Sequence, residues 1–266
     1  MKKNILHFPV LLSINILLLG ILACNVSAAV LSPTATVMPS PVPATGTSSP
    51  LLSQQVTVVS QPLGETNPNP PFTLTAQTPQ LTGSDDPRVT TFNQRLNELV
   101  KKEVDAWREN FLQITTVFNG STLDATYKLV SQIGDLWSFK FDFHFYSDGA
   151  AHPGLYSITL NYDLGQGREL ALGDLFLPNS NYLEVIANSC ITELSKQPGF
   201  EGPFADGAKP TPENYRNWNI TPDGLLITFD TYQVAPGASG PMQVLVPYDQ
   251  LKEVIDPQGP LAGVVP

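Results

Sequence analysis

Cysteine and positive charge are both scarce in this chain of 266 residues. Cys24 and Cys190 are the only cysteines, and 14 Lys and Arg face 24 Asp and Glu, a formal net charge of -10 at pH 7. This balance disfavours nucleic acid and anionic membrane surfaces as partners, because both attract clustered positive charge. If Cys24 is lipidated or removed, as argued below, the folded part holds one thiol and no intramolecular disulfide.

The familiar catalytic and metal-binding motifs are missing as well. The sequence has no HExxH, no GxSxG and no cluster of His and Cys. Cys190 falls with Leu183, Ile186 and Leu194 on one stripe of a helical pattern, which predicts a small buried side chain and not a nucleophile. We therefore expect no enzymatic activity, no cofactor and no metal site.

The N-terminus has the pattern of a secretory signal. Lys2 and Lys3 form a basic start, and a mostly apolar run from Val10 to Leu22 follows, which is short for a membrane span. The segment Ile21-Leu22-Ala23-Cys24 resembles a bacterial lipobox, so we expect a signal peptide over 1–23 and lipidation at Cys24. The chain would then be an extracytoplasmic lipoprotein of a bacterium, anchored in the membrane by that lipid.

Another cleavage site fits the same segment. Residues 26–29, "VSAA", satisfy the rule of small residues before a signal-peptidase cut. Cleavage there would discard Cys24, and the chain would be secreted.

Residues 24–71 are rich in Pro, Ser and Thr and carry a single charge, Glu65. Such a composition cannot bury enough apolar surface to order itself. We expect a disordered, extended tether of about 3 Å per residue.

Residues 72–165 predict an N-terminal α+β subdomain. Alternation in "PFTLTAQTPQLTG" indicates a short strand that ends at Pro79. Asp86 and Pro87 suit a helix start, and the apolar residues that follow recur at three and four positions as far as Trp107. Two alternating runs, "LWSFKFDFHFY" and "GLYSITLNYDL", are the right length to pair as a hairpin.

Residues 166–256 predict a second subdomain, and 257–266 a tail. The helix that carries Cys190 is followed by a Gly- and Pro-rich loop, then by strands in "ITPDGLLITFDTYQV" and "MQVLVPY", and by a closing helix in "YDQLKEVI". Strands and helices come in runs and not in strict alternation. The expected fold is therefore α+β, with mostly antiparallel sheets and packed helices in two subdomains.

The loop "YSDGAAHPG", residues 146–154, joins the two runs of the predicted hairpin. Asp148-Gly149 is a strong turn dipeptide, and Pro153 pushes His152 towards an extended backbone. We take Tyr146, Asp148, Gly149, His152 and Pro153 as candidates for a ligand-binding loop. The residue types favour a role in loop shape over catalysis, because no nucleophile or metal cluster accompanies the ring of His152.

The same residues carry a family resemblance. The stretch "FHFYSDGAAHPGLYSITLNYDLGQGRELALGDLF" resembles the RsiV-like domain family: a strand, a Gly-Ala-His-Pro loop, a second strand and an Asp-Leu-Phe segment. The segments "LTAQTPQLTG" and "ITPDGLLITFDTYQVAPGASGPMQVLVPYDQL" are similar to its opening and closing parts. The resemblance covers about residues 72–256, with a part like the PdaC N-terminal domain followed by the RsiV-like part.

What the resemblance implies is an extracytoplasmic module, mostly a binder, of the kind found in lysozyme-sensing anti-sigma factors and ahead of the catalytic domain of peptidoglycan deacetylases. We expect neither an anti-sigma segment nor a deacetylase domain here, which leaves the binding module. Its partner would be a lysozyme-like cationic protein or a cell-envelope glycan. Two alternatives stay open: a hydrolase or metal-dependent enzyme using Asp142, His144, Asp148 and His152, and a structural envelope lipoprotein.

Overall fold

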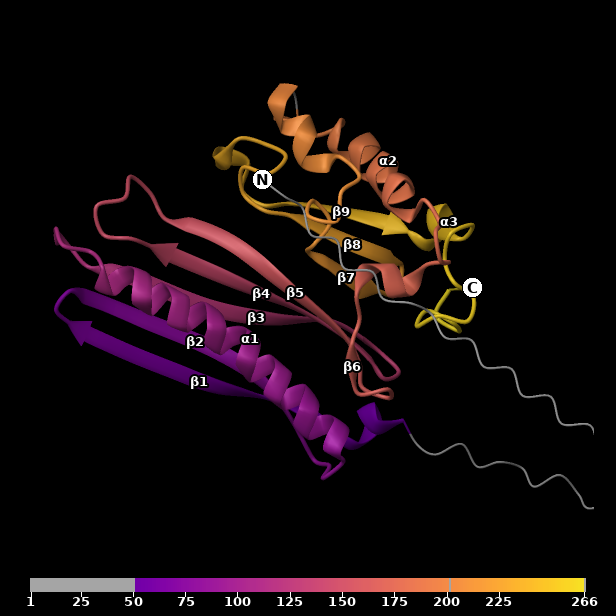
Figure 1. Cartoon of the computed structure of the whole chain (residues 1–266), viewed down its shortest axis with the longest axis horizontal. Helices are drawn as coiled ribbons and strands as arrows, with labels where there is room; N and C mark the ends of the chain where they lie inside the picture. Colours follow the sequence, from indigo (N-terminus) through magenta and orange to yellow (C-terminus); the bar gives the residue numbers. More distant parts are fainter. Residues whose placement is uncertain (1–50, 201, 266) are drawn as a thin grey trace, which may run out of the picture. The chain divides into compact units, whose positions relative to one another are not determined.

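The structure is a computed structural model that describes residues 51–200 and 202–265 (Figure 1). The predicted signal peptide, Cys24 and the first part of the predicted tether, up to residue 50, lie outside the described residues. Among the residues described, no helix has the length and apolar character needed to span a membrane. The elements in chain order are η1 (Leu52–Gln55), β1 (Thr57–Pro68), β2 (Pro71–Thr82), α1 (Pro87–Leu112), β3 (Ser121–Ile133), β4 (Leu136–Tyr146), β5 (Gly154–Asp163), β6 (Arg168–Glu169), η2 (Leu172–Leu175), α2 (Tyr182–Leu194), η3 (Gly202–Ala208), β7 (Trp218–Thr221), β8 (Gly224–Phe229), η4 (Gly237–Ser239), β9 (Met242–Pro247) and α3 (Tyr248–Leu251).

Two sheets organise the described residues, and they confirm the predicted α+β class. The larger sheet holds β1 to β6 in chain order, and the smaller one holds β7, β8 and β9. Neighbouring strands are antiparallel except β2 and β3, which are parallel because the long helix α1 carries the chain back across the sheet between them. Both sheets belong to one compact unit.

The predicted tether is wrong for the residues from 51 onward. Thr57–Pro68 form the edge strand β1, which pairs with β2 over its whole length. Its composition resembles that of a disordered linker because the strand buries little surface and needs few apolar side chains. Glu65, the one charge of the segment, accepts from the guanidinium of Arg108 on α1 at 2.6–3.0 Å.

Strand β2 also runs further than predicted, because Pro79 does not end it. Its pairing with β3 stops at Ala76↔Ala125, so Pro79 lies where β3 no longer pairs, while Ser60 of β1 still faces it. A proline is tolerated where no second neighbour requires its missing N–H.

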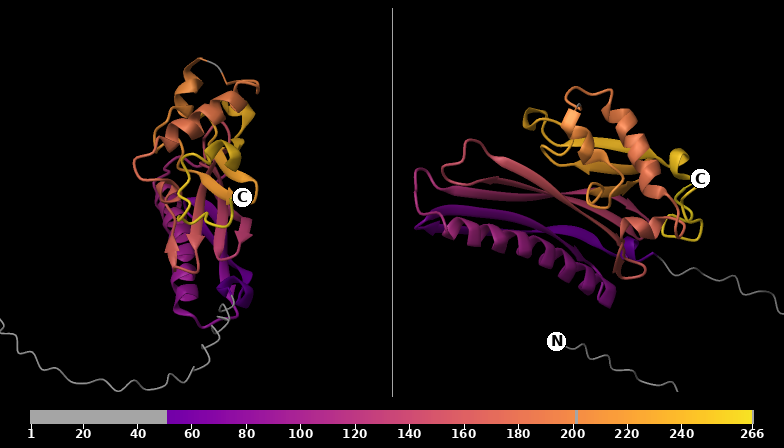
Figure 2. Two further views of the ribbon diagram at one scale, coloured as in Figure 1. Left: turned by 90° about the vertical axis from the view of Figure 1, so that its right-hand side faces the viewer. Right: turned by 45° about the horizontal axis from the view of Figure 1, so that its top comes forward.

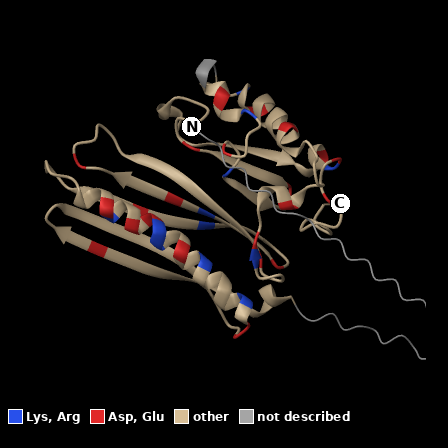
Figure 3. Cartoon of the chain, in the orientation of Figure 1, with Lys and Arg blue, Asp and Glu red and all other residues tan. Residues whose placement is uncertain are grey.

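Helix α1 follows its sequence signals closely. Asp86 caps it by accepting from the backbone N–H of Arg88 at 2.9 Å, and Pro87 is the first helical residue. The apolar stripe is buried against the larger sheet, and the outer face carries charges of both signs (Figure 3). The buried residues of the helix are Val89, Phe92, Leu96, Leu99, Val100, Val104 and Phe111.

Strands β4 and β5 pair as the predicted hairpin, with Phe145 opposite Gly154. The aromatic face of β4, formed by Trp137, Phe139, Phe141 and Phe143, is buried in the cluster that α1 covers. This face contributes four large aromatic side chains to the core of the larger sheet.

Part of the opposite face of β4 and β5, including Ser138, Ser157 and Asn161, is also buried, which sequence alternation alone does not indicate. Strand β7 lies across it, and both views in Figure 2 show the smaller sheet stacked on the larger one. The contact is polar: Asn161 accepts from the N–H of Ile220 at 3.1 Å and donates to the carbonyl of Trp218 at 2.7 Å. Ser138 donates to Asn161 at 2.6 Å, and Asn219 donates to Ser138 at 2.9 Å.

The smaller sheet and α2 enclose a second hydrophobic cluster. Cys190 lies in it with 0% exposure, which confirms the predicted burial. Leu261 is buried there too, and Val264 and Val265 pack against the cluster, so the predicted tail over 257–266 is part of the packed structure as far as residue 265.

One further prediction in this region needs correction. "ITPDGLLITF" forms two strands, β7 and β8, because the Pro-Asp-Gly turn folds the segment back on itself. The short closing helix predicted in "YDQLKEVI" is present as α3 and has 4 residues.

Candidate functional site

The turn of the predicted binding loop is held by Asp148. Its carboxylate accepts from the backbone N–H groups of Phe118 at 2.7 Å, Asn119 at 3.1 Å and Gly120 at 2.9 Å, and so ties the 146–154 loop to the end of the α1–β3 connection. Desolvation acts to raise the pKa of Asp148, but these N–H groups outweigh it and the pKa is lowered. Asp148 therefore stabilises the loop as a carboxylate that is hydrogen-bonded to three backbone N–H groups.

Gly149 has a backbone φ of 85°, the left-handed region that favours glycine. Tyr146 is the last residue of β4 and pairs with Thr122 of β3. These two residues, like Asp148, serve the shape of the loop.

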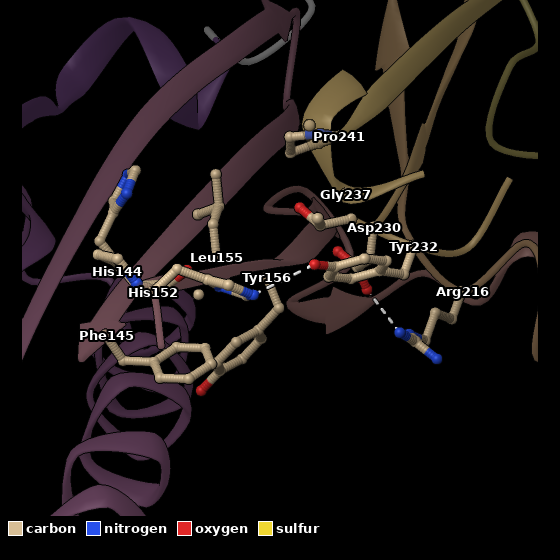
Figure 4. A pocket seen from close by; sticks show the side chains of 14 residues that line it. His144, Phe145, His152, Leu155, Tyr156, Arg216, Asp230, Tyr232, Gly237 and Pro241 are labelled. Carbon is tan, nitrogen blue, oxygen red and sulfur yellow. Dashed lines mark hydrogen bonds and ion pairs between the residues drawn. The ribbon is translucent and has the colours of Figure 1, made fainter. Parts of the chain in front are cut away.

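A cleft opens next to the loop, with a volume of about 620 Å³. One wall comes from β4, β5 and the loop between them, and the other comes from the segments around β8 and η4, 60 to 97 residues further along the chain (Figure 4). Its lining residues are His144, Phe145, His152, Pro153, Gly154, Leu155, Tyr156, Arg216, Asp230, Thr231, Tyr232, Gly237, Gly240 and Pro241.

His152 lies at the mouth of this cleft and is exposed. Its Nδ1 is 3.0 Å from the carbonyl oxygen of Pro153, and its Nε2 is 3.4 Å from the hydroxyl of Tyr232 on the other wall. Of the five predicted loop residues, the structure brings His152 and Pro153 to the cleft and leaves Tyr146, Asp148 and Gly149 outside its lining.

The floor of the cleft is an aromatic stack anchored on α1. The ring of Phe145 stacks on Trp107, with centroids 4.1 Å apart, and it lies over Gly154 of the neighbouring strand so closely that a Cβ there would be 2.2 Å from the ring. Tyr156 donates to Glu103 at 2.7 Å and accepts from the indole N–H of Trp107 at 3.0 Å. Burial and the hydrogen bond to Glu103 raise the pKa of Tyr156, so this hydroxyl stays neutral.

Tyr232 forms the opposite rim in an unusual backbone conformation. Its φ is 70°, a region that non-glycine residues rarely occupy and that costs about 1 kcal/mol or more. Its ring is packed over Gly237, where a Cβ would approach Cζ to 2.2 Å, and yet the residue is 57% exposed. A large ring is thus held in a strained position and presented to solvent.

Asp230 and Arg216 complete this wall. Asp230 is buried and accepts from the backbone N–H of Ser157 at 3.0 Å and from Arg216 Nη2 at 2.5 Å. The bond to Ser157 also joins the second wall to β5.

Of the four residues of the hydrolase alternative, His144 and His152 line the cleft, and the two carboxylates lie outside its lining. The carboxylate of Asp142 accepts from Lys140 and from the hydroxyl of Ser157, and Asp148 is bound to the 118–120 backbone. Across residues 51–200 and 202–265, no group of three or more His, Cys, Asp and Glu side chains is placed to hold a metal ion. The arrangement can stack and hydrogen-bond a ligand, and its carboxylates are occupied by protein donors.

Sequence reasoning missed most of the second wall. Tyr232, Arg216 and Asp230 carry no motif, and their approach to His152 depends on how the smaller sheet docks on the larger one. The one local signal is the Gly- and Pro-rich composition of the 236–241 segment, which is typical of exposed loops that carry binding residues.

Comparison with known proteins shows that part of this chain is similar to a described family. Residues 173–249, from η2 to the start of α3, match DUF3298, a family described as a protein of unknown function. A DUF3298-family structure from Bacteroides fragilis has a TM-score of 0.60 at 18% identity, and covers 79% of this chain and 97% of that chain. One from Pseudomonas aeruginosa has a TM-score of 0.54 at 16% identity, with 76% and 95% covered. At these identities the likeness shows the fold.

Two curated relatives are similar over shorter stretches. The peptidoglycan-N-acetylmuramic acid deacetylase PdaC of Bacillus subtilis is 28% identical over 170 residues, 61% of this chain and 36% of that protein. The immunogenic protein MPT64 of Mycobacterium tuberculosis is 30% identical over 107 residues, 40% of this chain and 47% of that protein. The chain thus spans less than half the length of each of these relatives.

Proposed function

We propose that this chain is an extracytoplasmic, non-catalytic binding module that holds a cell-envelope glycan in the cleft between His152 and Tyr232. The observation that carries the proposal is the exposed ring of Tyr232, held at positive φ over Gly237 and facing His152 across the cleft. Backbone strain that the surrounding structure maintains is a frequent property of functional sites.

The cleft suits a sugar more than a flat apolar ligand. Tyr232 presents an exposed aromatic ring, and Phe145 and Tyr156 line the floor, while the hydroxyl of Tyr232 and the imidazoles of His144 and His152 supply hydrogen-bonding groups. Aromatic faces with a few placed polar groups give a pocket both affinity and orientation. The similarity to PdaC, named for its action on peptidoglycan N-acetylmuramic acid, points to the same class of polymer.

The Gly-Ala-His-Pro loop supports the proposed similarity to the RsiV-like family. The lipobox supports the proposed extracytoplasmic, membrane-anchored location. In this proposal Cys24 carries the lipid that attaches the chain to the outside of the bacterial membrane, and residues 25–50 link it to the first described element. Cys24→Ala is expected to leave the precursor uncleaved or to release the protein in soluble form, because a single acyl-bearing thioether provides the attachment. A wild-type mature chain that begins at Ala29 or Val30 and is free in the medium contradicts this part.

A direct test is titration calorimetry of the full chain with soluble peptidoglycan fragments. Tyr232→Ala removes the ring, and Gly237→Ala displaces it by placing a Cβ 2.2 Å from Cζ, so both variants are expected to bind about tenfold more weakly. Phe118→Ala is the matched control, because Phe118 is 69% exposed and lies outside the cleft lining. Glycan binding that both Tyr232→Ala and Gly237→Ala leave unchanged would overturn the cleft as the site.

A cationic protein of the lysozyme kind is the second candidate, favoured by the net charge of -10. Acidic surfaces accelerate the association of basic partners at low salt. Binding of lysozyme that weakens steeply between low and physiological salt, and that Tyr232→Ala does not affect, would favour a protein partner on another surface over a glycan in the cleft.

A further inference from the structure

Arg216 gives the cleft a positive group that the binding of a neutral sugar leaves unused. Its side chain is 62% exposed and lines the cleft wall just before β7. One nitrogen, Nη2, donates to Asp230 Oδ2 at 2.5 Å, and among the residues that the structure describes Nε and Nη1 donate to no protein acceptor. The guanidinium therefore keeps donors for a ligand (Figure 4).

The pairing with Asp230 holds Arg216 in place without filling the cleft with negative charge. The Asp230 side chain is only 10% exposed, and it also accepts from the backbone N–H of Ser157 at 3.0 Å and from the amide of Asn217 at 3.3 Å. Its charge is thus directed at donors inside the protein, while the charge of Arg216 faces solvent. Among the lining residues, these are the two that carry a full charge when His is neutral.

We propose that Arg216 is a carboxylate-binding position and that the ligand of this cleft is an acidic sugar, one that bears a carboxylate beside the ring that Tyr232 contacts. This inference rests on the proposed glycan-binding function and specifies its substrate class. Nη2 carries two protons and uses one for Asp230, so its second proton and the neighbouring proton of Nε or Nη1 form a planar fork that matches the two oxygens of a carboxylate. A charge-assisted bond of this kind is stronger than a neutral one. In a chain of net charge -10, such a local positive group is needed for an anionic ligand to bind.

The sharpest test compares two probes that differ only in that carboxylate. The first is the disaccharide of N-acetylglucosamine and N-acetylmuramic acid with its lactyl carboxylate free, and the second is the same disaccharide with the carboxylate converted to an amide. We expect the full wild-type chain to bind the acid at least tenfold more tightly than the amide in titration calorimetry. The comparison uses the native chain, so it does not depend on whether a variant folds.

Variants then assign the difference to Arg216. Arg216→Gln is expected to bind acid and amide equally, and Arg216→Lys to keep part of the preference, because it retains the charge and loses the planar fork. Arg95→Gln is the matched control, since Arg95 lies on α1 outside the cleft and pairs with Glu169. Tyr232→Ala should weaken both probes by the same factor.

The outcomes separate the two proposals. Equal affinity of the wild-type chain for acid and amide, with both lost in Tyr232→Ala, overturns the carboxylate position and leaves glycan binding in the cleft standing. A preference for the acid that persists in Arg216→Gln also overturns the role of Arg216. Failure of the wild-type chain to bind either probe or any longer peptidoglycan fragment overturns both proposals.

Discussion

Cys190 and His152 carry the side chains most often recruited for chemistry, and the structure places them in opposite environments. The thiol is enclosed in the hydrophobic cluster between the smaller sheet and α2, and the imidazole is exposed at the mouth of the cleft. Both placements agree with a site that binds without a nucleophile. Nε2 of the imidazole forms a hydrogen bond with the hydroxyl of Tyr232 on the other wall.

Cys190 is expected to be unreactive in the folded protein. It is 0% exposed, and burial raises the pKa of its thiol to about 12, so at neutral pH neither access nor thiolate is available. Iodoacetamide at pH 8 should leave the peptide that contains Cys190 unmodified in the native chain and alkylate it after denaturation, as measured by mass spectrometry. Native labelling at the rate of a free thiol would contradict the buried position.

The loop residues are expected to differ in what their replacement costs. His152→Ala should lower the free energy of unfolding by about 1 kcal/mol or less, because it removes one long hydrogen bond to Tyr232. Gly149→Ala should cost more, since a Cβ is strained at a φ of 85°. Urea unfolding measures both, with His144→Ala, on the same wall, as the control. A His152→Ala protein of unchanged stability that has lost a hydrolytic activity of the wild type would contradict the proposal that His152 only maintains the conformation of the loop.

At the scale of elements, helix α1 and the β4–β5 hairpin support the cleft from below. Trp107 and Glu103 of α1 hold Phe145 and Tyr156, so the position of the helix sets the cleft floor. Single substitutions at the N-cap of α1 and at Gly154 of the hairpin therefore test whether these two elements hold the cleft floor in place.

The N-cap of α1 should make stability depend on acid pH. The side chain of Arg88, and then its backbone N–H, lower the pKa of Asp86 from 3.8 to about 2. A carboxylate with a lowered pKa in the folded state stabilises the fold above its unfolded pKa, and that contribution is lost as the pH falls from about 3.8 towards about 2. Asp86→Asn should therefore lower the melting temperature at pH 6 and flatten its fall over this window. Glu98→Gln, an exposed position on the same helix, is the control, and equal slopes in wild type and Asp86→Asn would contradict the role of the cap.

Gly154 should be the glycine of the hairpin that is hardest to replace. A Cβ there lies 2.2 Å from Cζ of Phe145, so Gly154→Ala must push that ring off Trp107 at a cost of roughly 1–3 kcal/mol. Gly64→Ala on β1 is a matched control, because nothing lies within 4 Å of its Cβ position. Urea unfolding of the two variants should differ accordingly, and equal stabilities would show that the ring does not lie over Gly154.

At the scale of the molecule, the cleft exists because the smaller sheet is docked on the larger one by polar side chains. Asn161 and Asn219 are buried, and their amides bridge β4, β5 and β7. The buried bond between Ser157 and Asp230 continues this connection to the cleft itself. Loosening the contact between the sheets should therefore change both stability and binding.

Asn161→Ala is expected to lower the free energy of unfolding by about 2 kcal/mol or more. It leaves the carbonyl of Trp218 and the hydroxyl of Ser138 without their Asn161 partner in a buried contact, while the N–H of Ile220 keeps Ser138 as its acceptor. Asn188→Ala, an exposed position on α2, should cost little. Chemical denaturation measures the free energy of unfolding of both variants. Titration of Asn161→Ala with the glycan measures whether the two cleft walls keep their relative position. A variant as stable as the wild type would show that the polar contact does not hold the sheets together.

Much of the local structure followed from the sequence. The cap at Asp86, the apolar stripe of α1, the alternation of β4 and β5, the turn at Asp148 and the burial of Cys190 are each encoded within a few neighbouring residues, and the structure confirms them. The mixed α+β class followed from the order of those elements. Strand β1 was not predicted, because an exposed edge strand rich in Pro and Thr has the composition of a linker. Its pairing with β2 is what makes this segment a strand.

The second wall of the cleft was decided by tertiary structure alone. Ser138 and Asn161 alternate with apolar neighbours as solvent-facing residues do, and they are buried because β7, separated from them by 57 to 82 residues, brings backbone donors and acceptors to them. Tyr232 meets His152 across 80 residues of sequence for the same reason. Periodicity reports which side chains share a face, but the partner of a polar face depends on long-range docking, and a hydrogen bond between distant segments leaves no spacing in the sequence to detect.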